Sequence, residues 1–98
     1  MKVLAVIRVI PIGTGKPGIG DYVKEVVEVI KKRGVKYQVT PFGTALEASS
    51  IMEVSTLIDE IIEKMRDSGV LRIAIDVSFD IRFDKEISLE YKVRRVID

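Results

Sequence analysis

The sequence predicts an α+β fold in which a four-stranded antiparallel sheet carries two helices, and three patterns support this prediction. The segment Leu71–Phe83 alternates without a break, with large apolar side chains on one face, as a half-buried strand does. The segment Lys2–Ile12 is mostly apolar on both faces, which is typical of a strand buried on both sides. Two other segments carry apolar residues at the spacing of amphipathic helices. We expect a single domain over residues 1–98.

The first half of the chain continues with a loop, a helix and a hairpin. The segment Pro11–Gly20 is dense in Gly and Pro, which favours a loop. Apolar residues at helical spacing then predict a helix that ends at Gly34. We expect strands at Val35–Thr40 and Thr44–Ala48, joined by a turn at Pro41–Gly43.

The second half contains a helix, the long strand and a short C-terminal element. Ser50 and Glu53 have the spacing of a capping box, which predicts the start of a helix that ends at Gly69. The strand Leu71–Phe83 would span roughly 43 Å at ~3.3 Å per residue, so we expect it to bend or to reach another subunit. Ser88–Asp98 predicts a short helix, with an extra edge strand as the alternative.

This order of elements is that of a ferredoxin-like βαββαβ sandwich, with the sheet order 4-1-3-2 and both helices on one face. The first strand then lies in the middle of the sheet. Because the helices cover only one face, we expect Leu4, Val6 and Ile10 to face water in a monomer. We therefore expect a homo-oligomer formed by contact between sheet faces, with pairing along the long edge strand as a further contact.

Composition excludes several classes of function. The formal net charge is +1, whereas nucleic-acid and membrane-surface binding favour a clear basic excess, so we expect neither partner. The absence of Cys and His removes disulfides, thiolate nucleophiles, ordinary zinc sites and the most usual general base. We expect no catalytic residue, no metal and no cofactor. No apolar run approaches the ~20 residues of a membrane span, and no signal-peptide pattern is present, which favours a cytoplasmic protein. The lack of Asn and the total of 28 Ile and Val residues are typical of a thermophile.

The segment Gly13–Gly18 matches the G-x-G-x-x-G pattern of phosphate-binding loops between a strand and a helix. The acidic residue that would bind a ribose is missing after the next strand, and 98 residues leave no room for a doubly wound sheet. We interpret the segment as a crossover loop, with a phosphate site that includes Lys16 as the alternative.

The sequence Pro-x-Gly-Thr occurs twice, ending in Thr14 after the first strand and in Thr44 after the second. These two strands are parallel in the predicted topology, so we expect both turns, together with Arg72, at one end of the sheet. Glu47 follows three residues after Thr44. The group would line a ligand pocket, or the two motifs are simply well-formed turns.

Asp76, Asp80 and Arg82 share the polar face of the long strand. Two carboxylates suggest acid–base chemistry, but four residues along a strand separate them by ~13 Å. We therefore interpret these charges as salt bridges and protection of an edge strand, with a small hydrolase that uses Asp80 and Arg82 as the alternative.

Taken together, these residues resemble the small thiamine-binding protein family over essentially the whole chain. The most specific part of the resemblance is Pro-Phe-Gly-Thr-x-x-Glu at residues 41–47. The other matching residues are Pro11–Thr14, Asp21–Val23, Gly34, Tyr37, Gly69, Arg72, Asp80, Arg82 and Lys92–Val93. That family is a single ferredoxin-like domain related to the YkoF-like binders of thiamine and hydroxymethylpyrimidine.

The resemblance implies a non-enzymatic cytoplasmic binder of thiamine or its pyrimidine precursor, assembled as a pair of dimers. Glu47 would bind the aminopyrimidine edge or the thiazolium cation, and Thr44 would hydrogen-bond the ligand. Phe42 or Tyr37 would stack on a ring, and turn amides such as that of Gly43 would complete the site. The alternative is an oligomeric regulatory or interaction module without a small-molecule ligand.

Overall fold

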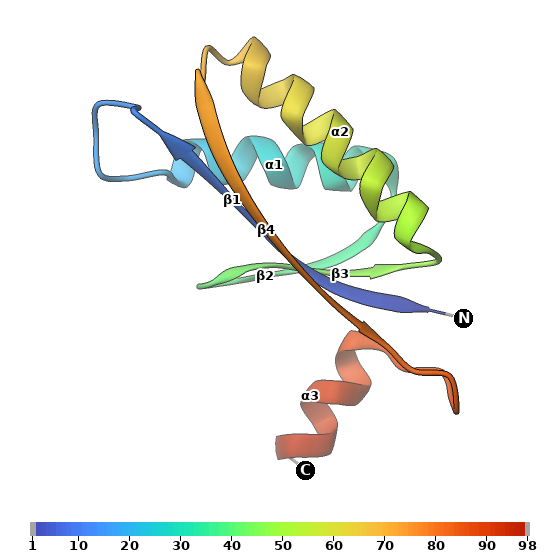
Figure 1. Ribbon diagram of the computed structural model, residues 1–98. Helices are drawn as coiled ribbons and strands as arrows, with labels where there is room; N and C mark the ends of the chain where they lie inside the picture. The colour runs from blue at the N-terminus through green and yellow to red at the C-terminus, as the bar shows by residue number, and fades with distance from the viewer. Residues whose placement is uncertain (1, 98) are drawn as a thin grey trace.

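The computed structural model describes residues 2–97 and confirms the predicted α+β fold (Figure 1). The elements in chain order are β1 (Val3–Ile12), α1 (Gly20–Arg33), β2 (Lys36–Thr40), β3 (Gly43–Ala48), α2 (Ile51–Asp67), β4 (Arg72–Ile81) and α3 (Leu89–Ile97). The strands form one antiparallel sheet in the order β2-β3-β1-β4, which is the predicted order read from the other edge. The C-terminal element is a helix rather than a strand. Residue 98, which the sequence placed in this element, lies outside the described residues.

The predicted end of α1 and the predicted start of α2 are confirmed by their caps, whereas α2 ends at Asp67, two residues before the predicted Gly69. Gly34 follows α1 with a left-handed backbone (φ 79°), and its N–H donates to the carbonyl of Lys31. Before α2, the Ser50 hydroxyl accepts the Glu53 N–H at 3.1 Å, and the Glu53 carboxylate accepts the Ser49 N–H at 2.9 Å. The capping box therefore fixes the start of α2 by two reciprocal hydrogen bonds.

The length of β4 is explained within one chain, because β1 pairs with it at every residue from Val3–Ile81 to Ile12–Arg72. The pairing of β3 with β1 ends much earlier, at Ile7–Thr44. Beyond that pair, β1 and β4 continue as a two-stranded ribbon that has no third strand beside it. On the side of β1 next to the β2–β3 hairpin, the backbone from residue 8 onward therefore pairs with none of the described strands. We call this side of β1 its free edge.

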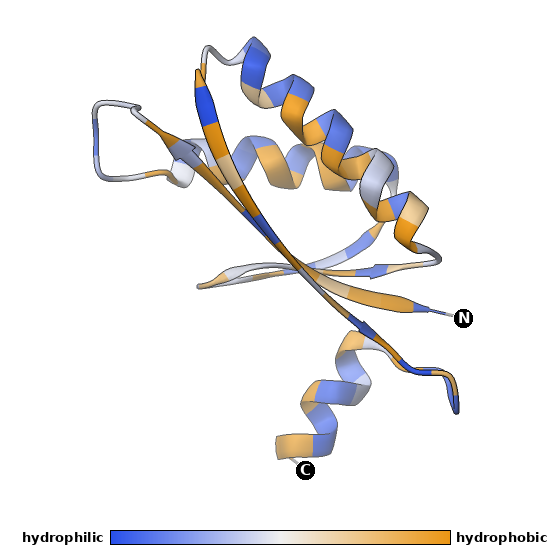
Figure 2. Ribbon diagram, in the orientation of Figure 1, coloured by the Kyte–Doolittle hydropathy of each residue, from blue (hydrophilic) through white to orange (hydrophobic). Residues whose placement is uncertain are grey.

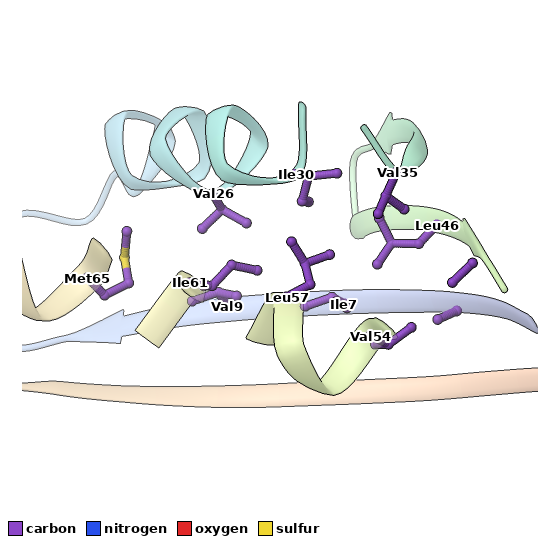
Figure 3. Close-up of a cluster of buried hydrophobic side chains, with 12 residues drawn as sticks. Ile7, Val9, Val26, Ile30, Val35, Leu46, Val54, Leu57, Ile61 and Met65 are labelled. Atoms are coloured by element: carbon purple, nitrogen blue, oxygen red, sulfur yellow. The ribbon is translucent and has the colours of Figure 1, made fainter. Parts of the chain in front are cut away.

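The main core lies between the sheet and the two long helices (Figure 3). Four side chains, Ile30, Leu46, Leu57 and Ile61, have no measurable exposure to solvent. Other members of this cluster include Ile7, Val9, Val26, Val35, Val54 and Met65. The alternation along β4 is visible in Figure 2, and its residues Ile73, Ile75 and Val77 pack against the same core. Burial of this apolar surface is the main force that holds the helices on the sheet.

The second face of the sheet is partly covered by α3, which lies on the side opposite α1 and α2 (Figure 1). The prediction that Leu4 faces water in a monomer is wrong, because Leu4 is only 3% exposed. Leu4 lies directly across from Glu47, which accepts a hydrogen bond from the first turn of α3, and Ile87 just before this helix is buried too. Val6 and Ile10 stay partly exposed, in agreement with the prediction.

Within residues 2–97, no helix has the length and apolar character that crossing a membrane requires.

Candidate functional site

A cavity of about 540 Å³ opens between α1, the tip of the β2–β3 hairpin and the free edge of β1. Its position follows from the strand lengths. Because β3 begins at Gly43, opposite Arg8, it leaves the rest of β1 without a neighbour on that side. The helix α1 then forms the other wall of the cavity.

The backbone of Val9 points toward this cavity. A Cβ atom on Gly43 would lie 3.0 Å from the carbonyl oxygen of Ile7, which shows that Ile7 directs its backbone groups toward β3. Backbone groups in a strand alternate in direction, so the N–H and C=O of Val9 point to the same side as those of Ile7. There β3 has ended, and Val9 contributes a donor and an acceptor to the cavity edge.

The walls of the cavity are mainly apolar. From α1 come residues at helical spacing, Val23 and Val27, together with Ile19 at the start of the helix. From the hairpin come Val39 and Phe42, which are 53% and 82% exposed. A flat ring placed between these two walls would therefore meet apolar side chains on both sides.

Four polar side chains complete the lining of the cavity, and the hydroxyl of one of them, Thr40, is engaged in the hairpin turn. Thr44 is almost fully buried at the floor, with 4% exposure. Lys24 is exposed at the α1 edge. The exposed side chain of Arg8 lies on the face of the sheet opposite α1, where its guanidinium pairs with Asp76 of β4. Among the described residues that line the cavity there is no Asp or Glu. On the α1 side of the described lining, the charged group is therefore the Lys24 ammonium.

Of the seven site residues predicted from sequence, Phe42, Gly43 and Thr44 line this cavity. Gly43 is required for the close contact of the hairpin with β1, because a Cβ there would also lie 3.0 Å from the side chains of Val6 and Arg8. The turn itself is held by the Thr40 hydroxyl, which donates to the Gly43 carbonyl at 2.8 Å and accepts the Phe42 N–H at 3.2 Å.

Thr14, Arg72 and Tyr37 are absent from the lining of this cavity. The prediction that both Pro-x-Gly-Thr turns lie together is wrong, because β1 continues five residues, roughly 17 Å, beyond the Ile7–Thr44 pair. Arg72 pairs with Ile12 at that distant end. Tyr37 packs against the main core.

Glu47 lies on the opposite face of the sheet from Thr44, since three residues along a strand reverse the direction of a side chain. The predicted grouping of these two residues in one pocket is therefore wrong for a single chain. The Glu47 carboxylate is 6% exposed and accepts the Leu89 N–H of α3 at 2.9 Å. It also forms ion pairs with Lys2 at 3.3 Å and Lys36 at 3.8 Å. Contact of Glu47, Thr14, Arg72 or Tyr37 with a ligand stays a prediction.

The α1 wall and the free backbone of Val9 were missed by sequence reasoning. Gly20, Val23, Lys24 and Val27 share one helical face beside the buried stripe, and this pattern was visible in the sequence. The difference in length between the strands 2–12 and 44–48 was visible too, and it implies a free edge on the longer strand.

The charged side chains of β4 form local ion pairs. Asp76 lies 3.7 Å from Arg8, and Asp80 pairs with Lys92 of α3. The Arg82 guanidinium donates to Asp84 at 2.6 Å and lowers the pKa of that carboxyl group. Asp80 and Arg82 thus have different partners, which favours salt bridges over the hydrolase alternative.

The G-x-G-x-x-G segment at residues 13–18 forms no part of the cavity lining. Within the loop, the Thr14 hydroxyl donates to the Lys16 carbonyl at 3.1 Å, and the Lys16 ammonium lies 3.4 Å from Asp21. These contacts support the interpretation of this segment as a crossover loop.

Comparison with known proteins shows relatives over nearly the whole chain. Curated relatives include the UPF0045 protein YqgV of Bacillus subtilis, 32% identical over 97 residues that cover 95% of this chain and 92% of the relative. A UPF0045 protein of Methanothermobacter thermautotrophicus is 32% identical over 94 residues, covering 96% of this chain and 95% of the relative. These relatives share the length of the chain as well as its sequence pattern.

Solved structures share the fold. A hypothetical protein of Methanocaldococcus jannaschii superposes with a TM-score of 0.85 at 31% identity, covering 97% of this chain and 95% of the other. A Thermotoga maritima protein described as a candidate thiamine biosynthesis or salvage protein superposes with a TM-score of 0.79 at 24% identity, covering 97% and 98% of the two chains. The model of the family named thiamine-binding protein matches residues 5–97. The chain therefore belongs to the thiamine-binding protein family, whose relatives also carry the name UPF0045.

Proposed function

We propose that this chain is a non-enzymatic cytoplasmic protein that binds thiamine or its hydroxymethylpyrimidine precursor in the cavity beside the β2–β3 hairpin. The observation that carries the proposal is the position of Phe42, Gly43 and Thr44. These residues belong to the most specific motif of the family resemblance, and all three line one cavity. Family membership and the description of the Thermotoga maritima protein support the choice of ligand.

The cavity offers groups that match an aminopyrimidine. Such a ring carries an amine donor beside a ring-nitrogen acceptor, and the edge of β1 at Val9 presents a carbonyl acceptor beside an amide donor. Phe42 would cover one face of the ring, with Val23 on the other side. Thr44 would add a hydroxyl group at the floor. Specificity would then rest on a few polar groups in an apolar pocket, the usual design of small-molecule sites.

We include homo-oligomerisation in the proposal, with a pair of dimers as the form implied by the resemblance. Val93, Val96 and Ile97 of α3 are 46%, 84% and 73% exposed, and Val6 and Ile10 on the same side of the sheet are partly exposed. A second copy would cover this surface. The same exposed surface supports the second candidate function, an oligomeric regulatory or interaction module without a small ligand.

Titration calorimetry of the purified protein with thiamine and with hydroxymethylpyrimidine tests the proposal. The variants Thr44→Val and Thr14→Val form a matched pair, because both remove the hydroxyl of a Pro-x-Gly-Thr motif but only Thr44 lines the cavity. We expect Thr44→Val to weaken binding roughly 2- to 12-fold, the value of one hydrogen bond, and Thr14→Val to bind as the parent does. No heat of binding with either ligand would favour the interaction module instead.

A further inference from the structure

The direction of β1 gives its free edge a polarity. The strand runs from Val3, where β3 lies beside it, to Ile12 at the end of the two-stranded ribbon. Within each residue of a strand the N–H comes before the C=O, so the Val9 N–H lies nearer the hairpin and the Val9 C=O lies nearer the end of the ribbon. The next residue that points its backbone to this side is Pro11, which has no N–H. Val9 therefore supplies the one N–H donor of the free edge over residues 8–12.

The end of the cavity at the hairpin is closed. Thr44 is 4% exposed, and Gly43 lies so close to β1 that an added Cβ would be 3.0 Å from the Ile7 carbonyl oxygen. The Thr44 hydroxyl forms no hydrogen bond within residues 2–97. This end therefore offers little space and a free hydroxyl donor.

The other end of the cavity, at the start of α1, is open. Because α1 runs back from the end of the ribbon toward β2, Ile19 and Gly20 line the cavity beyond Val9 (Figure 1). Gly20 is exposed, and a Cβ added to it would have no atom within 4 Å. Lys24, one turn later, is exposed too, so water and salt screen its charge. A large group, including a cation, therefore has room at this end.

An aminopyrimidine has a polarity that matches Val9. Along one side of the hydroxymethylpyrimidine ring, the carbon that carries a methyl group is followed by a ring nitrogen, the carbon that carries the amine and the carbon that carries the hydroxymethyl group. The ring nitrogen accepts and the amine donates, so the ring nitrogen pairs with the Val9 N–H and the amine pairs with the Val9 C=O. In the reversed direction, donor would face donor and acceptor would face acceptor.

We propose that β1 fixes the ligand in this one direction, with the methyl end of the ring against Thr44 and the substituent end open toward Gly20. The second ring nitrogen, beside the methyl group, then accepts the free Thr44 hydroxyl. This inference rests on the proposed function and adds which part of the ligand is selected. The cavity selects a methyl-sized group at the hairpin, and it accepts either a hydroxymethyl group or the thiazolium ring of thiamine at the open end.

Calorimetry tests the inference with three probes: hydroxymethylpyrimidine, its homologue with an ethyl group in place of the methyl group, and thiamine. We expect the ethyl homologue to bind about tenfold or more weakly than hydroxymethylpyrimidine, because the added carbon overfills a closed site. Thiamine is enlarged at the other end, so its affinity should stay within about tenfold of that of hydroxymethylpyrimidine.

The matched variants are Thr44→Ser and Ile19→Val, which each remove one carbon from the lining, at opposite ends of the cavity. Thr44→Ser keeps the hydroxyl and should recover most of the affinity lost by the ethyl homologue. Ile19→Val should leave that loss in place. The comparison of the three probes on the parent protein needs no variant, so the test does not depend on the folding of Thr44→Ser.

The outcomes separate the orientation from the proposed function. Equal affinity for the methyl and ethyl compounds, or recovery in Ile19→Val instead of Thr44→Ser, would overturn the orientation and leave the proposed function intact. Binding of hydroxymethylpyrimidine without binding of thiamine would also overturn it, because the substituent end would then be closed. Absence of binding by all three probes would overturn the proposed function together with this inference.

Discussion

Thr44 and Glu47 lie three residues apart on β3 and face opposite sides of the sheet. Thr44 lies at the floor of the cavity, whereas Glu47 accepts a hydrogen bond from Leu89 at the start of α3. The motif that most strongly suggests a ligand site thus divides into two parts. One part forms the cavity, and the other attaches the C-terminal helix to the sheet.

Replacement of Glu47 tests whether this residue holds α3 on the sheet. In Glu47→Ala the Leu89 N–H and the ammonium groups of Lys2 and Lys36 lose a nearly buried acceptor. We expect the free energy of unfolding to fall by about 1–3 kcal/mol, as measured by denaturant titration. Glu28→Ala, an exposed change on α1, is the control and should have little effect. If the two variants were equally stable, Glu47 would not hold α3.

Replacement of Gly43 tests the contact between the hairpin and β1. The added Cβ in Gly43→Ala would lie 3.0 Å from the Ile7 carbonyl oxygen and from side-chain atoms of Val6 and Arg8. The hairpin must shift to relieve this overlap, so we expect a loss of roughly 1–3 kcal/mol in the free energy of unfolding.

The control for Gly43 is Gly18→Ala, because no atom lies within 4 Å of the new Cβ and the φ angle of Gly18 is not positive. Its free energy of unfolding should stay within about 0.5 kcal/mol of the parent. Equal destabilisation in the two variants would mean that the crowding at Gly43 is not the cause.

The attachment of α3 should depend on pH. Glu90 on α3 accepts a hydrogen bond from Lys36 on β2, and this contact lowers the Glu90 pKa below the ordinary value of 4.5. A lowered folded-state pKa means that the stabilisation is present above the unfolded value and is lost as pH falls through the folded value. Hydrogen exchange should therefore show earlier opening of α3 than of α2 as the pH falls below about 4.5.

The variant Glu90→Gln distinguishes the loss of the Lys36–Glu90 ion pair from the effects of acid on other carboxyl groups. Its α3 should already open more readily at neutral pH and should respond less to acid than the α3 of the parent. Identical exchange profiles for parent and variant would show that the Lys36 contact does not stabilise the helix.

The exposed side of α3 predicts self-association. Light scattering should give a mass of at least twice the 11.0 kDa of one chain for the parent protein. Val96, which is 84% exposed, tests the surface involved: Val96→Glu should shift the protein toward monomers, because a carboxylate would be buried at the interface. Ser55→Glu on exposed α2 surface is the control and should keep the parent mass. A parent protein that runs as a monomer would contradict the prediction.

The fold could be predicted from the sequence because its signals are local. The caps at Gly34 and Ser50 and the alternation of the long strand each depend on neighbouring residues, and the structure confirms them for residues 72–81 of that strand. The predicted ends of the strand are wrong, because Leu71 and Phe83 lie outside β4 and are 98% and 87% exposed. The burial of Leu4 could not be predicted in this way. It depends on α3, which is more than eighty residues away in the sequence and reaches the second face only through tertiary contacts.

The site was predicted only in part, for two different reasons. The positions of Thr44 and Glu47 on opposite faces follow from the alternation of a strand, so the sequence already contained this information. The separation of Thr14 from Thr44 follows instead from the register of β1 with β3. Register is set by packing across the sheet, and the spacing of the two motifs does not determine it.

The most direct test of the central claim is a calorimetric titration with hydroxymethylpyrimidine of the parent and the variants Phe42→Ala and Phe83→Ala. The two phenylalanines are similarly exposed, at 82% and 87%, but only Phe42 lines the cavity. We predict that Phe42→Ala weakens binding about 2- to 12-fold, since an aromatic contact is worth roughly 0.5–1.5 kcal/mol, and that Phe83→Ala binds as the parent does. Binding that is unchanged in Phe42→Ala would contradict the assignment of this cavity as the ligand site.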